Sequence, residues 1–172
     1  MYRDVMAVAK SYYRLSMVVP FLRVEYLYGD VKKLFVVQRG VATPDLCKPM
    51  RSDNNLIFGA LLAANPITIY LDLRRRGLDV SAVRYEDLVA RPLDMCRVVL
   101  EFCHLPVSLA ELAVKAFDVD SQANSIVAKS AIGHFEEPKL TPQIKTKLNE
   151  ILEKCGFPPV GEPIIVEGTL SC

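Results

Sequence analysis

Residues 80–92 read Val-Ser-Ala-Val-Arg-Tyr-Glu-Asp-Leu-Val-Ala-Arg-Pro, and this stretch decides the fold class that we predict. Its first four residues, Val80 to Val83, favour a short β-strand, since valine is common in extended backbone. The Tyr-Glu-Asp-Leu segment that follows indicates a turn. Pro92 then opens a helix, because proline is well tolerated at the first helical position. The stretch therefore predicts a strand, a turn and a helix in succession.

Around this stretch the chain alternates helical patterns with few strand candidates. Apolar residues recur at helical spacing in five segments that carry start or stop signals. They are Val5 to about Met17, Asp53 to Gly77 with a kink or fresh start at Asn65-Pro66, a helix from Pro92, a helix with a Ser108–Glu111 capping box, and a helix from Thr141-Pro142 to Gly156. The further strand candidates are Leu34–Val37, which also fits a helical turn, and Pro163–Val166. A complete doubly wound sheet needs more strands than these.

Composition limits the kind of protein. The 172 residues make a single domain, 1–172, and 51% hydrophobic with 24% charged residues is an ordinary globular balance. The net charge of +1 argues against broad nucleic-acid binding, which needs a strongly basic surface. Five scattered cysteines without a C-x-x-C pair, and only two histidines, argue against a metal site. We expect reduced thiols, with Cys96 and Cys103 packed in the core rather than bridged.

The longest apolar run, Leu56 to Leu71, raises the question of a membrane span. It contains Asn65-Pro66 and is shorter than the roughly 20 residues that a spanning helix needs. We interpret it as a buried core helix and predict no transmembrane segment. Arg3 and Asp4 interrupt the start of the sequence, which does not fit a signal peptide.

Arg3 and Ser11 are the first candidate ligand-binding residues. Asp4 is placed to cap the helix that begins at Val5, and Ser11 follows about two helical turns after Arg3. A guanidinium offers a planar fork of donors and a hydroxyl offers one more, so the two can converge on one phosphate. A solvated arginine and a surface serine produce the same spacing, so a second motif is needed.

The second motif is Arg84-Tyr85-Glu86-Asp87-Leu88. Together, the two segments resemble the sulfotransferases that use 3′-phosphoadenosine 5′-phosphosulfate (PAPS). The resemblance implies an α/β, P-loop-like fold with a short parallel sheet. It also implies transfer of a sulfuryl group from PAPS to a hydroxyl acceptor, with Arg3 and Ser11 binding the 3′-phosphate of PAPS or of its product PAP. We interpret Glu86 and Asp87 as a helix cap and turn rather than as catalytic groups.

Two further features bear on this resemblance. The polar stretch 120–130 contains Lys129, which is a third candidate contact because relatives close this region over the nucleotide. The phosphate-cradling loop with its lysine, which binds the phosphosulfate end in the family, has no counterpart here. The family's general base would also precede residue 1. We therefore expect a fold truncated at its N-terminus, name no catalytic residue, and expect no sulfotransferase activity from these 172 residues alone.

Three interpretations stay open. The chain is a sulfotransferase whose other part lies elsewhere, a non-catalytic nucleotide-binding or structural remnant of that fold, or another P-loop-like enzyme such as a nucleotide kinase. The Arg-Tyr-Glu-Asp-Leu motif favours the first and leans to the Golgi carbohydrate type. The small-molecule partner is then a nucleotide, and the compartment is the Golgi lumen or the cytoplasm.

Overall fold

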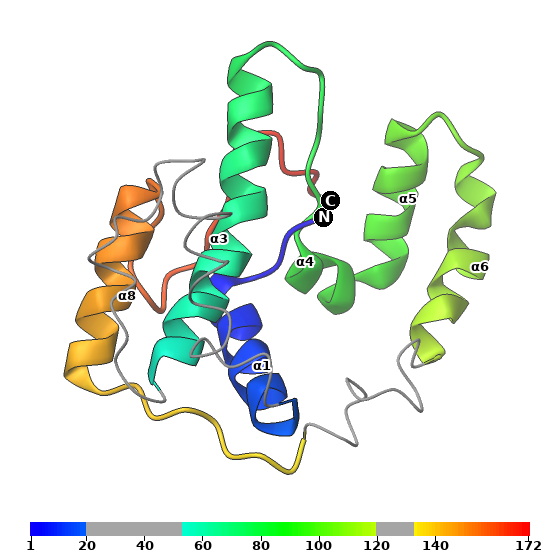
Figure 1. The fold of residues 1–172 in the computed structure, drawn as a ribbon. Helices are drawn as coiled ribbons and strands as arrows, with labels where there is room; N and C mark the ends of the chain where they lie inside the picture. Colours follow the sequence, from blue (N-terminus) through cyan, green and yellow to red (C-terminus); the bar gives the residue numbers. More distant parts are fainter. Residues whose placement is uncertain (20–52, 120–132) are drawn as a thin grey trace.

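The computed structural model describes residues 1–19, 53–119 and 133–172. Helices dominate these ranges (Figure 1). They are α1 (Val5–Val18), α3 (Asp53–Arg75), α4 (Tyr85–Ala90), α5 (Pro92–Phe102), α6 (Ala110–Lys115) and α8 (Pro142–Lys154), with short 3₁₀ turns η3 (Val107–Leu109) and η4 (Ala116–Asp118).

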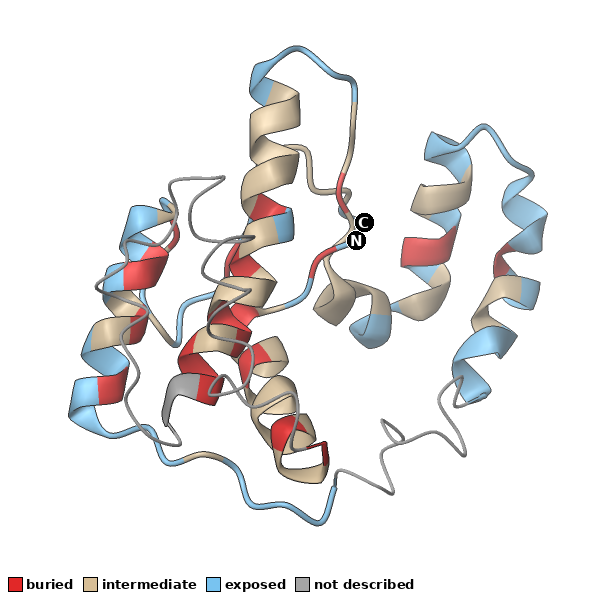
Figure 2. Cartoon of the chain, in the orientation of Figure 1, coloured by how far each residue is buried: buried red, intermediate tan, exposed pale blue. Residues whose placement is uncertain are grey.

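The core lies where α3 packs between α1 and α8. Buried side chains gather on the facing sides of these three helices, whereas α5 and α6 bury few residues, namely Met95, Cys96 and Ala110 (Figure 2). The fully buried core includes Leu56 and Ala60 of α3, Val5 of α1, and Leu148 and Ile151 of α8. Removing such apolar faces from water is the main favourable term in folding, so these helices stabilise one another.

The helices α1 and α8 form as predicted because their signals are local. The Asp4 carboxylate accepts a hydrogen bond from the backbone N–H of Ala7 at 2.8 Å, which caps α1. The Thr141 hydroxyl does the same for Ile144 at 3.3 Å at the start of α8. Gly156, with φ of +74°, follows the end of α8 in a conformation that glycine adopts without strain.

Helix α3 runs without a break through Pro66, so the fresh start predicted as one alternative at Asn65-Pro66 is wrong. Its segment Asn55–Arg75 has a mean hydropathy of 1.6 and is long and apolar enough to cross a membrane by length and composition alone. The helix is therefore longer than the apolar run from Leu56 to Leu71 that the sequence shows. In this structure 44% of its most apolar window is buried inside, against α1 and α8.

The predicted parallel sheet, and with it the α/β P-loop-like fold class, is wrong. The described ranges contain no β-strand, only two isolated parallel bridges, Tyr2 with Arg84 and Ala82 with Thr169. The Tyr2–Arg84 pairing cannot lengthen toward the helices, because Asp4 already caps α1 and α4 begins at Tyr85. Val80–Val83 and Pro163–Val166 belong to neither a strand nor a helix. Leu34–Val37 lies outside the described residues.

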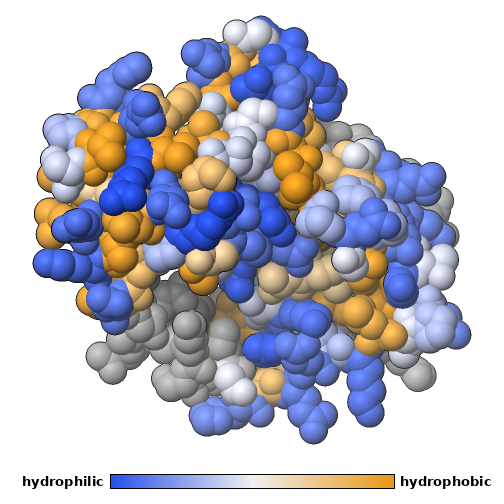
Figure 3. Space-filling model, turned by 180° about the vertical axis from the view of Figure 1, so that it is seen from behind, coloured by the Kyte–Doolittle hydropathy of each residue, from blue (hydrophilic) through white to orange (hydrophobic). Residues whose placement is uncertain are grey.

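The capping box predicted for Ser108 and Glu111 is also absent. Ser108 lies inside η3, and α6 begins only at Ala110, with no side chain capping its first turn. The segment 102–119 exposes several large apolar side chains. They are Phe102, Leu105, Val107, Leu109, Leu112, Phe117 and Val119. Hydrophobic residues are visible on the left of the molecule in Figure 3, which is the side of α5 and α6.

Gly59 is the point of closest approach between α1 and α3. A Cβ atom built on it would lie 2.9 Å from the Ala9 Cα and 2.9 Å from the Tyr12 Cβ, closer than real contacts allow. We therefore expect Gly59→Ala to destabilise the fold by about 1 kcal/mol or more, since overpacking outweighs the gain in helix propensity. Urea denaturation measures this, and Ala63→Gly on the same helix sets the propensity scale. A higher unfolding midpoint for Gly59→Ala would contradict the close contact.

The cysteines differ in environment, and all four within the described ranges are free. Cys96 is buried as expected, but Cys103 is exposed, so the prediction that both pack in the core is wrong for Cys103. Burial raises the pKa of Cys155 to about 11. Cys47 lies outside the described residues.

We expect iodoacetamide at pH 8 to alkylate Cys155 at least about tenfold more slowly than Cys103, because only the thiolate reacts. Peptide mass spectrometry after a short pulse measures both rates. Labelling in denaturant is the control and should remove the difference. Equal rates in the native protein would contradict the burial of Cys155.

Candidate functional site

The two segments that carry the sequence motifs lie side by side. The backbone N–H of Tyr2 donates to the carbonyl oxygen of Val83 at 2.9 Å, and that of Tyr85 donates to the carbonyl of Tyr2 at 2.8 Å. These bonds form one parallel bridge between Tyr2 and Arg84. The start of α1 is thereby fixed against the start of α4.

The C-terminal segment completes this junction. The backbone N–H of Ala82 donates to the carbonyl of Gly168 at 3.0 Å, and that of Leu170 donates to the carbonyl of Ala82 at 2.8 Å. The Tyr2 ring is buried between these segments, and its hydroxyl lies 3.0 Å from the Thr169 hydroxyl. Residues close to both ends of the chain thus meet here (Figure 1).

A charged group holds the same junction from the other side. One carboxylate oxygen of Glu86 accepts the backbone N–H of Asp4 at 2.9 Å. The Arg84 guanidinium lies 3.5 Å from the other Glu86 oxygen and 3.3 Å from an Asp87 oxygen. Glu86 therefore binds the two segments together, whereas Asp87 contacts Arg84 of its own segment. The helix cap predicted for this pair is not seen, because no side chain caps α4.

Arg3 is placed differently from its neighbours. Its side chain is exposed, and its Cζ lies 4.8 Å from the centroid of the Tyr85 ring, which is cation–π geometry. Within the described ranges its guanidinium makes no hydrogen bond or ion pair. The Tyr85 ring thus supports one face of the guanidinium, and the N–H groups at its edge stay available to an anion.

Ser11 is not joined to Arg3 by any contact among the described residues. Its side chain is half-buried, and its hydroxyl donates to the carbonyl oxygen of Ala7 at 2.9 Å, one helical turn back. The convergence of Arg3 and Ser11 on one phosphate therefore stays a prediction. The third candidate, Lys129, lies outside the described residues.

A second polar group, which sequence reasoning missed, lies further along α1. Lys10 and Arg14 both contact the carboxylate of Glu137, with N–O distances of 2.7 and 2.5 Å. The hydrogen bond from Lys10, followed by the Coulomb attraction of Lys10, holds the pKa of Glu137 below its usual value. The sequence could have indicated this group, because Lys10 and Arg14 are one helical turn apart and so lie on a single face of the helix.

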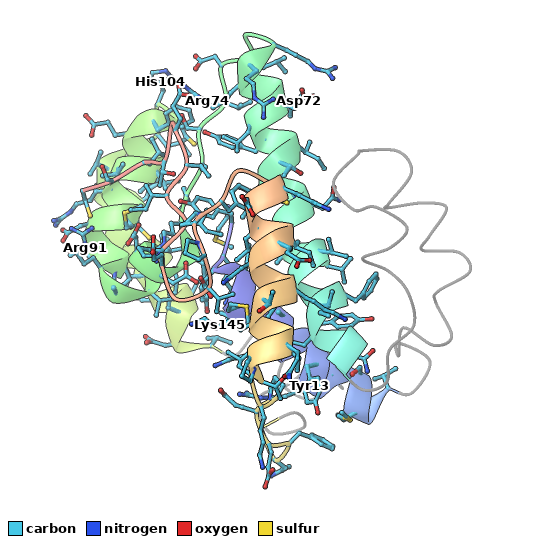
Figure 4. The ribbon with its side chains drawn as sticks, turned by 90° about the vertical axis from the view of Figure 1, so that its left-hand side faces the viewer. Tyr13, Asp72, Arg74, Arg91, His104 and Lys145 are labelled. Carbon is cyan, nitrogen blue, oxygen red and sulfur yellow. The ribbon has the colours of Figure 1, made fainter. Side chains whose placement is uncertain are left out.

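Glu137 also borders a pocket of about 270 Å³. The pocket lies between α1, α3 and the beginning of α8, where Figure 4 shows Tyr13. Its lining residues are Tyr13, Leu56, Glu136, Glu137, Pro138, Lys139, Thr141 and Ile144. Neither Arg3 nor Ser11 lines it, so this pocket is separate from the predicted phosphate site.

Other residues considered for binding have structural surroundings. Arg74, in the last turn of α3, donates to the carbonyl of Val80 at 2.6 Å, and Arg76 pairs with Asp72 at 2.7 Å. His104 and His134 are both exposed. The described ranges contain no group of three or more His, Cys, Asp or Glu side chains that could hold a metal ion.

Comparison with known proteins adds no assignment: no protein-family model, no curated protein and no solved structure matches this chain.

The Glu86 contact gives a test of the junction. We expect Glu86→Ala to lower the free energy of unfolding by about 1 kcal/mol or more, because the Asp4 N–H loses its acceptor and the Arg84 guanidinium loses one of its two ion-pair partners. Chemical denaturation measures the change. The control is Glu153→Ala, which removes an exposed carboxylate from α8. Equal stabilities for the two variants would mean that Glu86 does not hold the segments together.

Proposed function

We propose that this chain is a sulfotransferase-type protein that binds the 3′-phosphate of PAPS or PAP through Arg3. The reaction that this proposal implies is transfer of the sulfuryl group of PAPS to a hydroxyl acceptor. The observation that carries the proposal is the backbone pairing of Tyr2 with Val83 and Tyr85, which brings the two motifs of the resemblance into contact.

The position of Arg3 suits recognition of a phosphate. Its guanidinium is exposed, rests on the Tyr85 ring at 4.8 Å and has no competing carboxylate partner among the described residues. An arginine held in one orientation loses less conformational entropy when it binds, and its fork matches two phosphate oxygens. The nearby Glu86 and Asp87 carboxylates are paired with Arg84, which limits their repulsion of an anion.

The helix N-terminus supports binding less directly. Asp4 already occupies one of the free N–H groups in the first turn of α1, because its carboxylate accepts from Ala7. A phosphate would therefore lie beside the helix start rather than on its axis. Ser11 can donate to that phosphate only if its hydroxyl turns away from the Ala7 carbonyl, so its contribution should be smaller than that of Arg3.

The proposal does not extend to a catalytic residue. Sulfuryl transfer needs donors that stabilise the charge developing on the transferring group, and a base that takes the proton of the acceptor hydroxyl. Arg3 is proposed to bind only the nucleotide's 3′ end, and its described contact is with the Tyr85 ring. A non-catalytic nucleotide-binding role rests on the same observation, and a measurement of PAPS turnover would separate it from an enzyme.

Calorimetric titration of PAP and of AMP, which lacks the 3′-phosphate, tests the proposal. We expect PAP to bind more tightly than AMP, and Arg3→Lys to weaken PAP about tenfold because the bidentate fork is lost while the charge stays. Ser11→Ala should weaken PAP less. Arg97→Lys changes an exposed arginine on α5 in the same way and should leave PAP binding unchanged.

Two outcomes would contradict the proposal. Equal affinities for PAP and AMP would show that the 3′-phosphate is not recognised. Equal weakening of PAP by Arg3→Lys and Arg97→Lys would show that Arg3 has no specific part in binding.

A further inference from the structure

The Lys10–Arg14–Glu137 group has the features of an anion site that the chain itself fills. Two cations from one face of α1 contact one carboxylate from a distant segment, at 2.7 and 2.5 Å. Both cationic side chains are partly shielded, at 33% and 25% exposure, whereas Glu137 is 56% exposed. The cations thus form the floor of the site, and the carboxylate covers them from the solvent side.

Charge and hydrogen bonding in this group are only partly balanced. Glu137 supplies one negative charge against the two positive charges of Lys10 and Arg14. The Arg14 Nε atom is buried and has no hydrogen-bond partner within the described ranges. A doubly charged tetrahedral oxyanion would neutralise both cations and carries more acceptor oxygens than a carboxylate.

The covering segment is weakly held. Residues 133–141 form neither helix nor strand, and 133–137 are all exposed. Exposed ion pairs add little net stability, since solvent screens them and ordering two side chains costs entropy. Displacing Glu137 from Lys10 and Arg14 is therefore a small cost for an incoming anion.

We propose that Lys10 and Arg14 form a binding site for a phosphate dianion, and that Glu137 is its internal, displaceable occupant. The site goes beyond the proposed function and does not depend on it, because its contacts involve neither Arg3 nor Tyr85. Glu137 competes with phosphate for the same donors. Removing its charge should therefore raise phosphate affinity without creating new contacts.

Inorganic phosphate, titrated at constant ionic strength and pH 7.5, is the probe, and the affinity from calorimetric titration is the readout. We expect Glu137→Gln to bind phosphate roughly fivefold more tightly than the wild type, on the scale of competing exposed ion pairs. The additional change of Lys10 and Arg14 to Gln should abolish this gain. Lys145→Gln in the Glu137→Gln background is the matched control, because it removes an exposed lysine of α8 (Figure 4) and should keep the gain.

Several results would overturn the proposal. One is a Glu137→Gln variant that binds phosphate no more tightly than the wild type. Another is a gain that survives the loss of Lys10 and Arg14, or disappears equally with Lys145→Gln. Arg3→Lys separates this site from the nucleotide site, because it should weaken PAP and leave the phosphate titration unchanged. A gain lost on Arg3→Lys would place the phosphate at Arg3 and also overturn the proposal.

Discussion

The close packing of α1 on α3 at Ala9 and Gly59 is the constraint on which the other features depend. A hydrogen in place of a side chain at Gly59 lets the two helix backbones approach until no Cβ atom fits between them. This contact fixes the direction of α1, and the opposite side of α3 is then available to Leu148 and Ile151 of α8. Because protein interiors are closely packed, this one small residue sets the geometry of the core.

The direction of α1 also determines where the side chains of Tyr2 and Arg3, just before its first turn, are placed. Tyr2 points inward and is buried, with its hydroxyl 3.0 Å from that of Thr169, whereas Arg3 is exposed. This alternation is what extended backbone imposes, since successive side chains point to opposite faces. Burial of Tyr2 thus presents Arg3 to solvent, and the pairing with residues 83–85 brings the Tyr85 ring beneath it.

The two proposed anion sites use α1 in different ways. Arg3 precedes the helix and is supported by an aromatic ring, with its donors free among the described residues. Lys10 and Arg14 lie within the helix and already hold the carboxylate of Glu137. The first site is open and the second is occupied. The same arrangement leaves the apolar side chains of α5 and α6 outside the main core.

The sequence by itself determined α1 and α8, because a cap and an apolar stripe act within a few residues of each other: Asp4 with Ala7, and Thr141 with Ile144. It also identified the two motif segments that prove to be neighbours. The tertiary structure alone decided that Val80–Val83 forms no strand, because a strand needs a partner of matching length, and here the paired segments are cut short by helix starts. The tertiary structure alone also decided the contacts of Arg3 with Tyr85 and of Lys10 with Glu137. Such contacts join residues far apart in the chain, and only the packing of the helices brings them within reach.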